Sequence, residues 1–206
     1  MTSDPTAFLY PFLDAGEDDL ETVLADASAS TVRKGADVIE LRRQIDLDAV
    51  IACGEAIHER LERGGRLIAF GNGGSATDAQ DAAGDFLAGG WPAIALTNDA
   101  ATITAVGNDV GYANVFARQL IALAREDDVA LAISTSGSSP NVLAALEEAQ
   151  RRSLLTCAIT GYDGGRLREL TWLDHLFVTE CDYVPRLQET HATIYHLLLD
   201  VVGERT

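Results

Sequence analysis

The chain has 206 residues, which is enough for one domain with a sizeable core and short for two. Hydrophobic residues make up 47% of it and charged residues 23%, which is typical of a folded globular protein and excludes a disordered or fibrous one. The formal net charge of −17 makes direct binding to nucleic acid or to an anionic membrane unfavourable, and no apolar run approaches the roughly 18 residues of a membrane helix.

The cysteine content and the N-terminus bear on the compartment. Cys53, Cys157 and Cys181 are an odd number and have no CxxC spacing, so they predict neither a disulfide framework nor a zinc knuckle. The N-terminus lacks a basic stretch followed by an apolar one, the pattern of a secretion signal. We therefore expect a cytoplasmic protein in a reducing compartment.

The first part of the chain is predicted to be helical. Residues 1–18 hold two prolines, a glycine and several apolar residues, and predict an irregular arm that packs on its own domain or on another subunit. Apolar residues then recur at helical spacing over residues 20–43 and again after Asp46, which predicts two helices. The pair Gly64-Gly65 ends the second helix.

From residue 64 onward, short apolar runs alternate with helical patterns. The predicted strands cover residues 66–70, 93–96, 129–133, 155–159 and 174–178. The predicted helices cover residues 76–87, 112–124, 141–152, 165–170 and 185–202. This alternation indicates a largely parallel sheet with helices on both faces. We predict a single α/β domain over residues 19–206, with a helical part at 19–63 and an α/β core at 64–206.

The first of two candidate phosphate-binding loops spans residues 71–75, whose sequence is GNGGS. Its glycines permit positive φ angles and let an anion approach the backbone, and the start of the next helix supplies unpaired N–H groups. The loop is not GxGxxG and has no P-loop lysine, which argues against a dinucleotide or a nucleoside triphosphate. In a purely structural alternative, the loop is a tight turn and Ser75 only caps the helix.

The second candidate loop spans residues 134–139, whose sequence is STSGSS. Its five hydroxyl groups and one glycine could bind an anion through side-chain and backbone donors without a positive charge. In open parallel sheets, ligands bind beyond the carboxyl ends of the strands, where both loops are predicted to lie. The two loops therefore predict one phosphate site, with a flexible serine-rich turn as the alternative.

Five short motifs follow one another in the order found in a known family. They are Gly71-Asn72-Gly73-Gly74-Ser75, Gly107-Asn108-Asp109, Ile133-Ser134-Thr135-Ser136-Gly137, Thr160-Gly161-Tyr162-Asp163-Gly164-Gly165 and Arg186-Leu187-Gln188-Glu189. Through them the chain resembles the sugar isomerase (SIS) domain family, and more closely its phosphoheptose isomerase branch, over residues 40–203. The resemblance implies a Rossmann-like, three-layer fold with a five-stranded parallel sheet, a homotetramer with sites at subunit interfaces, and interconversion of sedoheptulose 7-phosphate with D-glycero-D-manno-heptose 7-phosphate.

The resemblance also assigns site residues. The residues that it implies for substrate binding are Asn72, Gly73, Gly74, Ser75, Asn108, Asp109, Ser134, Thr135, Ser136, Ser139 and Gln188. The residues that it implies for a divalent cation, zinc in the family, are Asp81, Asp85, Gln188 and His196. Among these, Asp85 would be the catalytic base and His196 its acid/base partner.

Two positions depart from the family, whose isomerases carry His in place of Asp81 and Glu in place of Asp85. Isomerisation through an enediol needs a carboxylate that moves a proton between C1 and C2, so the shorter side chain of Asp85 must still reach the sugar. The two aspartates are four residues apart and share a helix face, where they could bind one cation of a harder type than zinc. Alternatively, both are ordinary solvent-facing acids.

Two histidines lie near the C-terminus, and only one of them is expected at the site. His191 and His196 are five residues apart, about 140° around a regular helix, and the resemblance favours His196. The leading expectation is an aldose–ketose isomerase that acts on a phosphorylated sugar. The alternative is a noncatalytic phosphosugar-binding or protein-binding module, like the SIS-domain regulator of replication initiation. The expected partners are a phosphorylated sugar and further copies of the chain.

Overall fold

The computed structural model describes residues 20–204 and falls into two units, residues 1–39 and residues 40–206. The predicted arm at residues 1–18 lies outside the described residues. In the first unit, the described residues belong to helix α1 (Leu20–Arg43), whose last residues open the second unit. Within the described part of the chain, no helix combines the length and the apolar character needed to cross a membrane.

The second unit is built on a parallel sheet of five strands in the order β2-β1-β3-β4-β5. The strands are β1 (Leu67–Gly71), β2 (Ala93–Ala95), β3 (Val129–Ser134), β4 (Leu155–Gly161) and β5 (His175–Thr179). Gly71 pairs with Ile133, and Ser134 pairs with Thr160. The carboxyl ends of the three central strands therefore lie together at one edge of the sheet.

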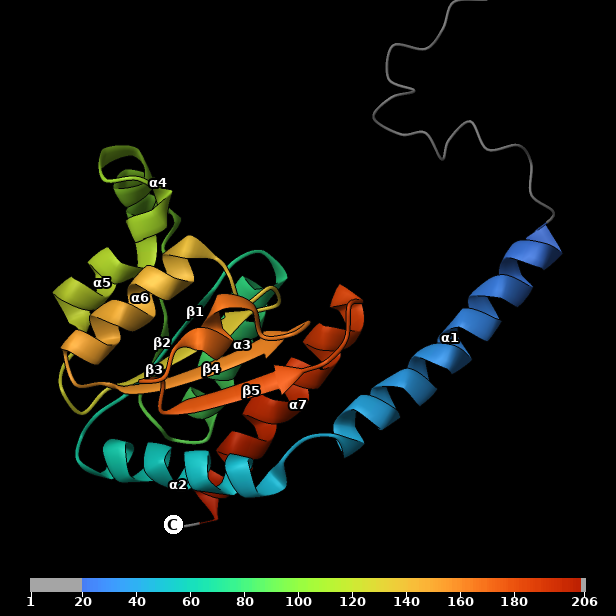
Figure 1. Cartoon of the computed structure of the whole chain (residues 1–206), viewed down its shortest axis with the longest axis horizontal. Coiled ribbons are helices and arrows are strands. Elements are labelled where there is room, and N and C mark those ends of the chain that lie inside the picture. Colours follow the sequence, from blue (N-terminus) through green and yellow to red (C-terminus); the bar gives the residue numbers. More distant parts are fainter. Residues whose placement is uncertain (1–19, 205–206) are drawn as a thin grey trace, which may run out of the picture. The chain divides into compact units, whose positions relative to one another are not determined.

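Helices cover both faces of this sheet, with α2, α3 and α7 on one face and α5 and α6 on the other (Figure 1). The helices are α2 (Leu47–Glu62), α3 (Gly74–Ala88), α4 (Ala100–Asp109), α5 (Val115–Leu123), α6 (Pro140–Arg151) and α7 (Val184–Gly203), with short 3-10 turns η2 (Tyr112–Asn114) and η3 (Gly165–Glu169). The predicted five-stranded α/β fold is confirmed.

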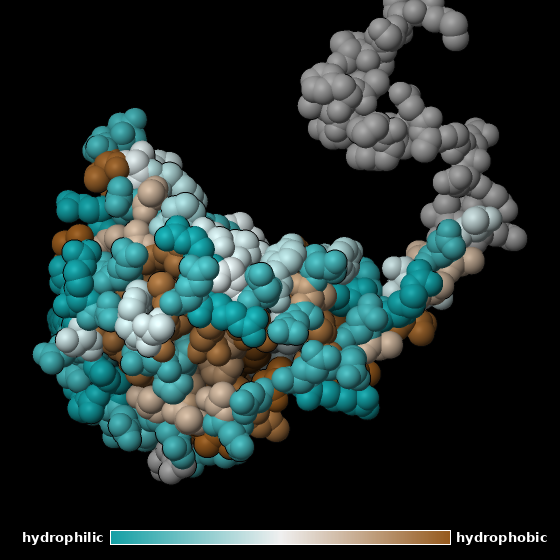
Figure 2. Space-filling model, in the orientation of Figure 1, coloured by the Kyte–Doolittle hydropathy of each residue, from teal (hydrophilic) through white to brown (hydrophobic). Residues whose placement is uncertain are grey.

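The core forms because side chains of each central strand alternate between the two faces. In β1, Leu67 and Ala69 pack with α2, α3 and α7, whereas Ile68 and Phe70 pack with α5 and α6. All residues of β1, β3 and β4 are buried, as expected for parallel strands that are covered on both faces. On the near face of this unit, hydrophilic residues lie mainly around the rim, and hydrophobic residues are exposed between them (Figure 2).

Helix α4 is the element that the apolar pattern of the sequence missed. Its residues include two threonines, two branched aliphatic residues and a glycine, which have low helix propensity, and none of them is buried. The helix begins where the Asp99 carboxylate accepts hydrogen bonds from the backbone N–H groups of Ala101 and Thr102, at 3.0 and 3.2 Å. The hydrogen bond from the Thr102 hydroxyl lowers the pKa of Asp99 most, and these backbone contacts lower it further. An aspartate N-cap was the available signal.

Candidate functional site

The first loop leads from β1 directly into α3, which begins at Gly74, two residues earlier than predicted. Gly73 precedes the helix with a φ of 57° and provides no side-chain cap. Ser75 is buried in the first turn, so it does not cap the helix as the structural alternative supposed. A Cβ atom on Gly74 would lie 1.9 Å from Nε2 of Gln188. The glycine therefore lets the Gln188 amide of α7 lie directly against this loop.

A reciprocal amide pair joins the first loop to the second. Nδ2 of Asn72 donates to Oδ1 of Asn141 at 2.8 Å, and Nδ2 of Asn141 donates to Oδ1 of Asn72 at 2.8 Å. Asn141 is the second residue of α6 and is separated from the serine-rich loop by Pro140 alone. The hydroxyl of Tyr112 also donates to Oδ1 of Asn72, at 3.1 Å. The sequence analysis missed Asn141 and Tyr112, because neither belongs to a recognised motif.

The second loop is held by its own hydroxyls and by the segment after β4. The hydroxyl oxygens of Ser134 and Ser139 lie 3.3 Å apart. Gly137 has a φ of 60°, and a Cβ atom there would lie 2.0 Å from the carbonyl oxygen of Gly164. Ser136 stays exposed at the surface of the loop, and Thr135 and Ser139 are partly exposed. Neither loop contains a cationic side chain, so an anion would be bound by N–H and hydroxyl groups.

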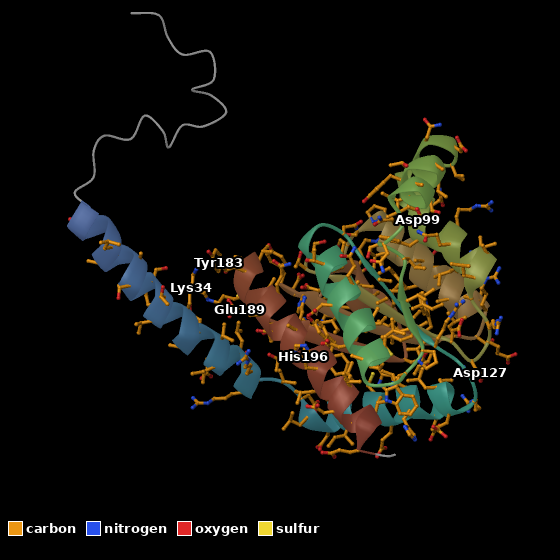
Figure 3. The ribbon with its side chains drawn as sticks, turned by 180° about the vertical axis from the view of Figure 1, so that it is seen from behind. Lys34, Asp99, Asp127, Tyr183, Glu189 and His196 are labelled. Atoms are coloured by element: carbon orange, nitrogen blue, oxygen red, sulfur yellow. The ribbon has the colours of Figure 1, made fainter. Side chains whose placement is uncertain are left out.

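An acidic cluster with one histidine lies between α3 and α7. His196 is labelled on α7, which runs beside α3 (Figure 3). Its Nε2 atom lies 2.9 Å from Oδ2 of Asp85, and the hydroxyl of Tyr195 donates to Oδ2 of Asp81 at 2.6 Å. One ligand atom each of Asp81, Asp85 and His196 lies within 4.8 Å of the others. This spacing would suit a single cation.

Two residues of α7 near His196, Tyr195 and His191, are buried, and burial changes the pKa of each. Burial and the contact with Asp81 raise the pKa of Tyr195, so its hydroxyl remains a proton donor to that carboxylate. His191 is fully buried, and burial lowers its pKa to about 4, with a smaller opposing effect of the Thr160 carbonyl. The side chain of His196 is 51% exposed and faces the cluster instead. The structure therefore places only His196 with the aspartates.

Asp78 is a further acid beside the cluster that the sequence analysis missed. It lies one turn before Asp81 on α3, and its Oδ2 atom is buried without a hydrogen-bond partner among the described residues. Burial raises its pKa to about 6; hydrogen bonding to the Gln188 amide lowers the pKa, and the charge of Asp81 raises it further. Gln188 therefore contacts both the first loop and Asp78. The only signal for Asp78 in the sequence was its position three residues before Asp81.

The predicted pair Asn108 and Asp109 lies at the end of α4. Both side chains are exposed, and Nδ2 of Asn108 donates to Oδ1 of Asp109 at 2.9 Å. Within residues 20–204 neither side chain hydrogen-bonds to either loop. The contact from this part of the chain to the loops is made instead by Tyr112, three residues after Asp109.

Comparisons with known proteins agree with the motifs. The family model described as "SIS domain" matches residues 32–161. A phosphoheptose isomerase from Thermodesulfovibrio yellowstonii is 42% identical over 169 residues, which cover 79% of this chain and 82% of that protein. One from Geobacter sulfurreducens is 40% identical over 188 residues, covering 88% and 98%. The solved structure of a phosphoheptose isomerase from Francisella tularensis matches with a TM-score of 0.81 and 35% identity, covering 88% and 98%. These relatives are named as enzymes, which favours the catalytic expectation over the noncatalytic one.

Proposed function

The chain belongs to the SIS domain family, and on that premise we propose that it converts sedoheptulose 7-phosphate into D-glycero-D-manno-heptose 7-phosphate. Its close relatives are isomerases, and the chain is an isomerase as well. The observation that carries the proposed reaction is the distance of 2.9 Å between Oδ2 of Asp85 and Nε2 of His196. It gives one site both a carboxylate and an imidazole, the two groups that an enediol mechanism needs.

In this mechanism Asp85 moves the carbon-bound proton. Its carboxylate removes a proton from C1 of the ketose and later returns one to C2. His196 donates a proton to the carbonyl oxygen at C2 as the enediol forms, and then takes the proton from the oxygen at C1 as the aldose forms. Both side chains end in the protonation state in which they began, so the site is ready for the next turnover.

The two loops would hold the phosphate away from the reacting carbons. The hydroxyls of Ser134, Thr135, Ser136 and Ser139 are the proposed phosphate ligands, supported by the exposure of Ser136 and the contact between Ser134 and Ser139. Asn72, Gly73, Gly74, Ser75 and Gln188 would line the sugar, and Asn108 and Asp109 would meet its hydroxyls. Because the chain carries a net charge of −17, the attraction to the phosphate must come from local N–H groups and the start of α3.

A divalent cation fits the acidic cluster. Asp81, Asp85 and His196 would hold it, because their ligand atoms lie within 4.8 Å of one another, and Gln188 is a fourth ligand by family resemblance. Two carboxylates and one imidazole can bind zinc and also suit harder cations. When bound, the cation would supply positive charge that polarises the carbonyl group of the sugar.

We also propose that residues 19–206 act as one domain in a cytoplasmic homotetramer. The side chains of Asp85 and His196 are 39% and 51% exposed, which leaves the reacting groups open to water in one chain. Large apolar residues are exposed on α3, where Leu87 is 56% exposed, and on α2, where Leu47 and Ile51 are 56% and 45% exposed. Contacts between copies would cover such residues and exclude water from the site.

The test is to incubate the purified protein with sedoheptulose 7-phosphate in D₂O, with Zn²⁺, Mn²⁺ or Mg²⁺ supplied. We expect the aldoheptose product and deuterium at C2 of that product, both detected by NMR. The matched control is Glu59→Gln, which removes an exposed carboxylate on α2 and should leave the rate unchanged. Binding of the sugar phosphate without product and without deuterium incorporation, under all three metal conditions, would contradict the proposed reaction.

A further inference from the structure

Tyr112 lies on the surface, yet its hydroxyl reaches the first loop. The residue is 58% exposed and belongs to the short turn η2 between α4 and α5. Its hydroxyl donates to Oδ1 of Asn72 at 3.1 Å. Among the described residues it is the only side chain between α4 and α5 that hydrogen-bonds to either candidate loop. Such a contact from an exposed residue into a ligand-binding loop calls for a functional explanation.

The hydrogen bonds of Asn72 define what this side chain can offer to a ligand. An asparagine side chain has two acceptor positions on Oδ1 and two N–H groups on Nδ2. Both acceptor positions are used, one by Asn141 and one by Tyr112. One N–H group donates to Oδ1 of Asn141, and the other has no partner among the described residues. The uncommitted N–H group is therefore what Asn72 can present to a bound sugar phosphate.

The same contacts fix the orientation of the Asn72 amide. If the amide rotated by half a turn, its NH₂ group would face the NH₂ group of Asn141, and both bonds of the pair would be lost. Tyr112 adds a third contact to the same amide, and this contact limits smaller tilts of the amide. Asn141 is almost fully buried, whereas Tyr112 is exposed, so the Tyr112 bond can be removed with little effect on the core.

We propose that Tyr112 is a positioning residue for substrate binding, which aims the free N–H group of Asn72 at the sugar phosphate. The inference rests on the proposed function for its ligand. It follows from the absence of cationic side chains in both loops, because an anion then depends on well-aimed N–H and hydroxyl donors. A misdirected neutral donor should weaken binding about twofold to tenfold.

The experiment compares the wild-type protein with Tyr112→Phe, which keeps the ring and removes only the hydroxyl. Titration calorimetry with sedoheptulose 7-phosphate should give a Kd about twofold to tenfold higher, with a parallel rise in KM. The kcat should stay within about twofold and the Tm should not change, because neither the reacting groups nor the core is touched. The matched control is Tyr183→Phe, which removes the hydroxyl of another exposed tyrosine and should leave the Kd unchanged.

A double-mutant cycle then tests whether Tyr112 acts through Asn72. In an Asn72→Ala background, Tyr112→Phe should have no further effect on the Kd. Additive effects of the two substitutions, an unchanged Kd for Tyr112→Phe, or a fall in Tm and kcat together would overturn the inference. If the wild-type protein binds the heptose phosphate without isomerising it, the proposed reaction fails while the Kd comparison still decides the role of Tyr112. Absence of any binding by the wild-type protein would overturn both.

Discussion

The Oδ2 atom of Asp85 lies 2.9 Å from Nε2 of His196, although the two residues are 111 positions apart in the sequence. The contact exists because α3 and α7 pack on the same face of the sheet and share one core. It brings a carboxylate and an imidazole together between α3 and α7. The proposed base Asp85, which is shorter than the Glu that the family resemblance implies, is therefore in contact with its proposed acid/base partner.

Removing the charge of Asp85 should stop catalysis while leaving substrate binding intact. Asp85→Asn keeps the shape of the side chain but cannot accept the carbon-bound proton, so kcat should fall about 10²- to 10⁴-fold. The Kd for the sugar phosphate should stay within about twofold, because the proposed phosphate ligands lie in the two loops and not on Asp85. Both values can be measured with the NMR assay and calorimetry. An Asn variant that retains full deuterium exchange would show that another residue is the base.

Lengthening the same side chain tests whether reach limits the rate. Asp85→Glu restores the carboxylate length of the family, and we expect kcat to be preserved or raised. A misplacement of about 1 Å can cost about a hundredfold in rate, so a gain of this order is possible. The measurement is kcat at saturating substrate. If the Glu variant falls as far as the Asn variant, the site of this chain is built for the shorter residue.

Tyr195 should strengthen cation binding without contacting the cation. Its hydroxyl holds Oδ2 of Asp81 at 2.6 Å, and the tyrosine is 2% exposed, so the carboxylate has a fixed orientation. Loss of such an outer hydrogen bond typically weakens metal affinity about 10- to 100-fold. We expect this loss for Tyr195→Phe in calorimetry with Mn²⁺ or Zn²⁺. Asp81→Asn, which removes a ligand, should cost more, and equal affinities for wild type and Tyr195→Phe would contradict the role given to the hydroxyl.

Three glycines should respond differently to replacement by alanine. In Gly74→Ala the atoms nearest to the new Cβ atom would be those of the Gln188 amide, at the end of a flexible side chain, so activity should fall while the free energy of unfolding changes by less than about 1 kcal/mol. Gly137→Ala would place a Cβ atom 2.0 Å from a backbone carbonyl at a φ of 60°, and should destabilise the fold by more than about 2 kcal/mol.

Gly84→Ala is the control for this series. Its Cβ atom would meet nothing within 4 Å, and the position lies inside α3, so alanine should stabilise the protein by about 0.5–1 kcal/mol. Urea unfolding and kcat measured on the three variants check all the outcomes. A Gly74→Ala variant with normal kinetics would show that the position of Gln188 is not important.

Buried His191 should make the protein less stable in acid. Burial lowers its pKa from 6.5 to about 4, so the folded protein binds this proton less readily than the unfolded chain does. The contribution of neutral His191 to the free energy of unfolding is therefore complete above pH 6.5. It falls by about 3 kcal/mol in total as the pH falls from 6.5 towards 4.

A His191→Leu variant isolates this contribution. Neither ring nitrogen makes a hydrogen bond of ordinary geometry with a described residue, so leucine should keep the free energy of unfolding at pH 7 within about 1.5 kcal/mol. Between pH 6.5 and 4 the variant should lose less stability than the wild type in urea unfolding. Equal losses in the two proteins would show that His191 does not titrate as described.

The sheet and both loops could be predicted from the sequence because they depend on local signals. Apolar runs that end at Gly71 and Ser134 fix where β1 and β3 stop, and the spacing of Asp81 and Asp85 already implied a shared helix face. Asp78, Asn141 and Tyr112 could not be predicted in this way, because their importance comes from neighbours that are distant in the chain. Helix α4 was missed because Ile103 and Val106 are its only large apolar residues, which is too few for a periodic pattern.

Helix α4 has a consequence for how this enzyme could acquire new substrates. None of its ten residues is fully buried, and Ile103 and Val106 pack against the core, so most of its sequence is under weaker packing demands than the rest of the unit. It nevertheless ends at Asn108 and Asp109, the residues proposed to meet the sugar hydroxyls, and leads into the turn that holds Tyr112. Replacing the helix with that of another sugar-phosphate isomerase could therefore change the preferred sugar, while the proposed phosphate loops and the proposed proton-transfer pair stay as they are. Helix α4 is therefore a segment in which both natural and engineered substitutions could change the preferred sugar.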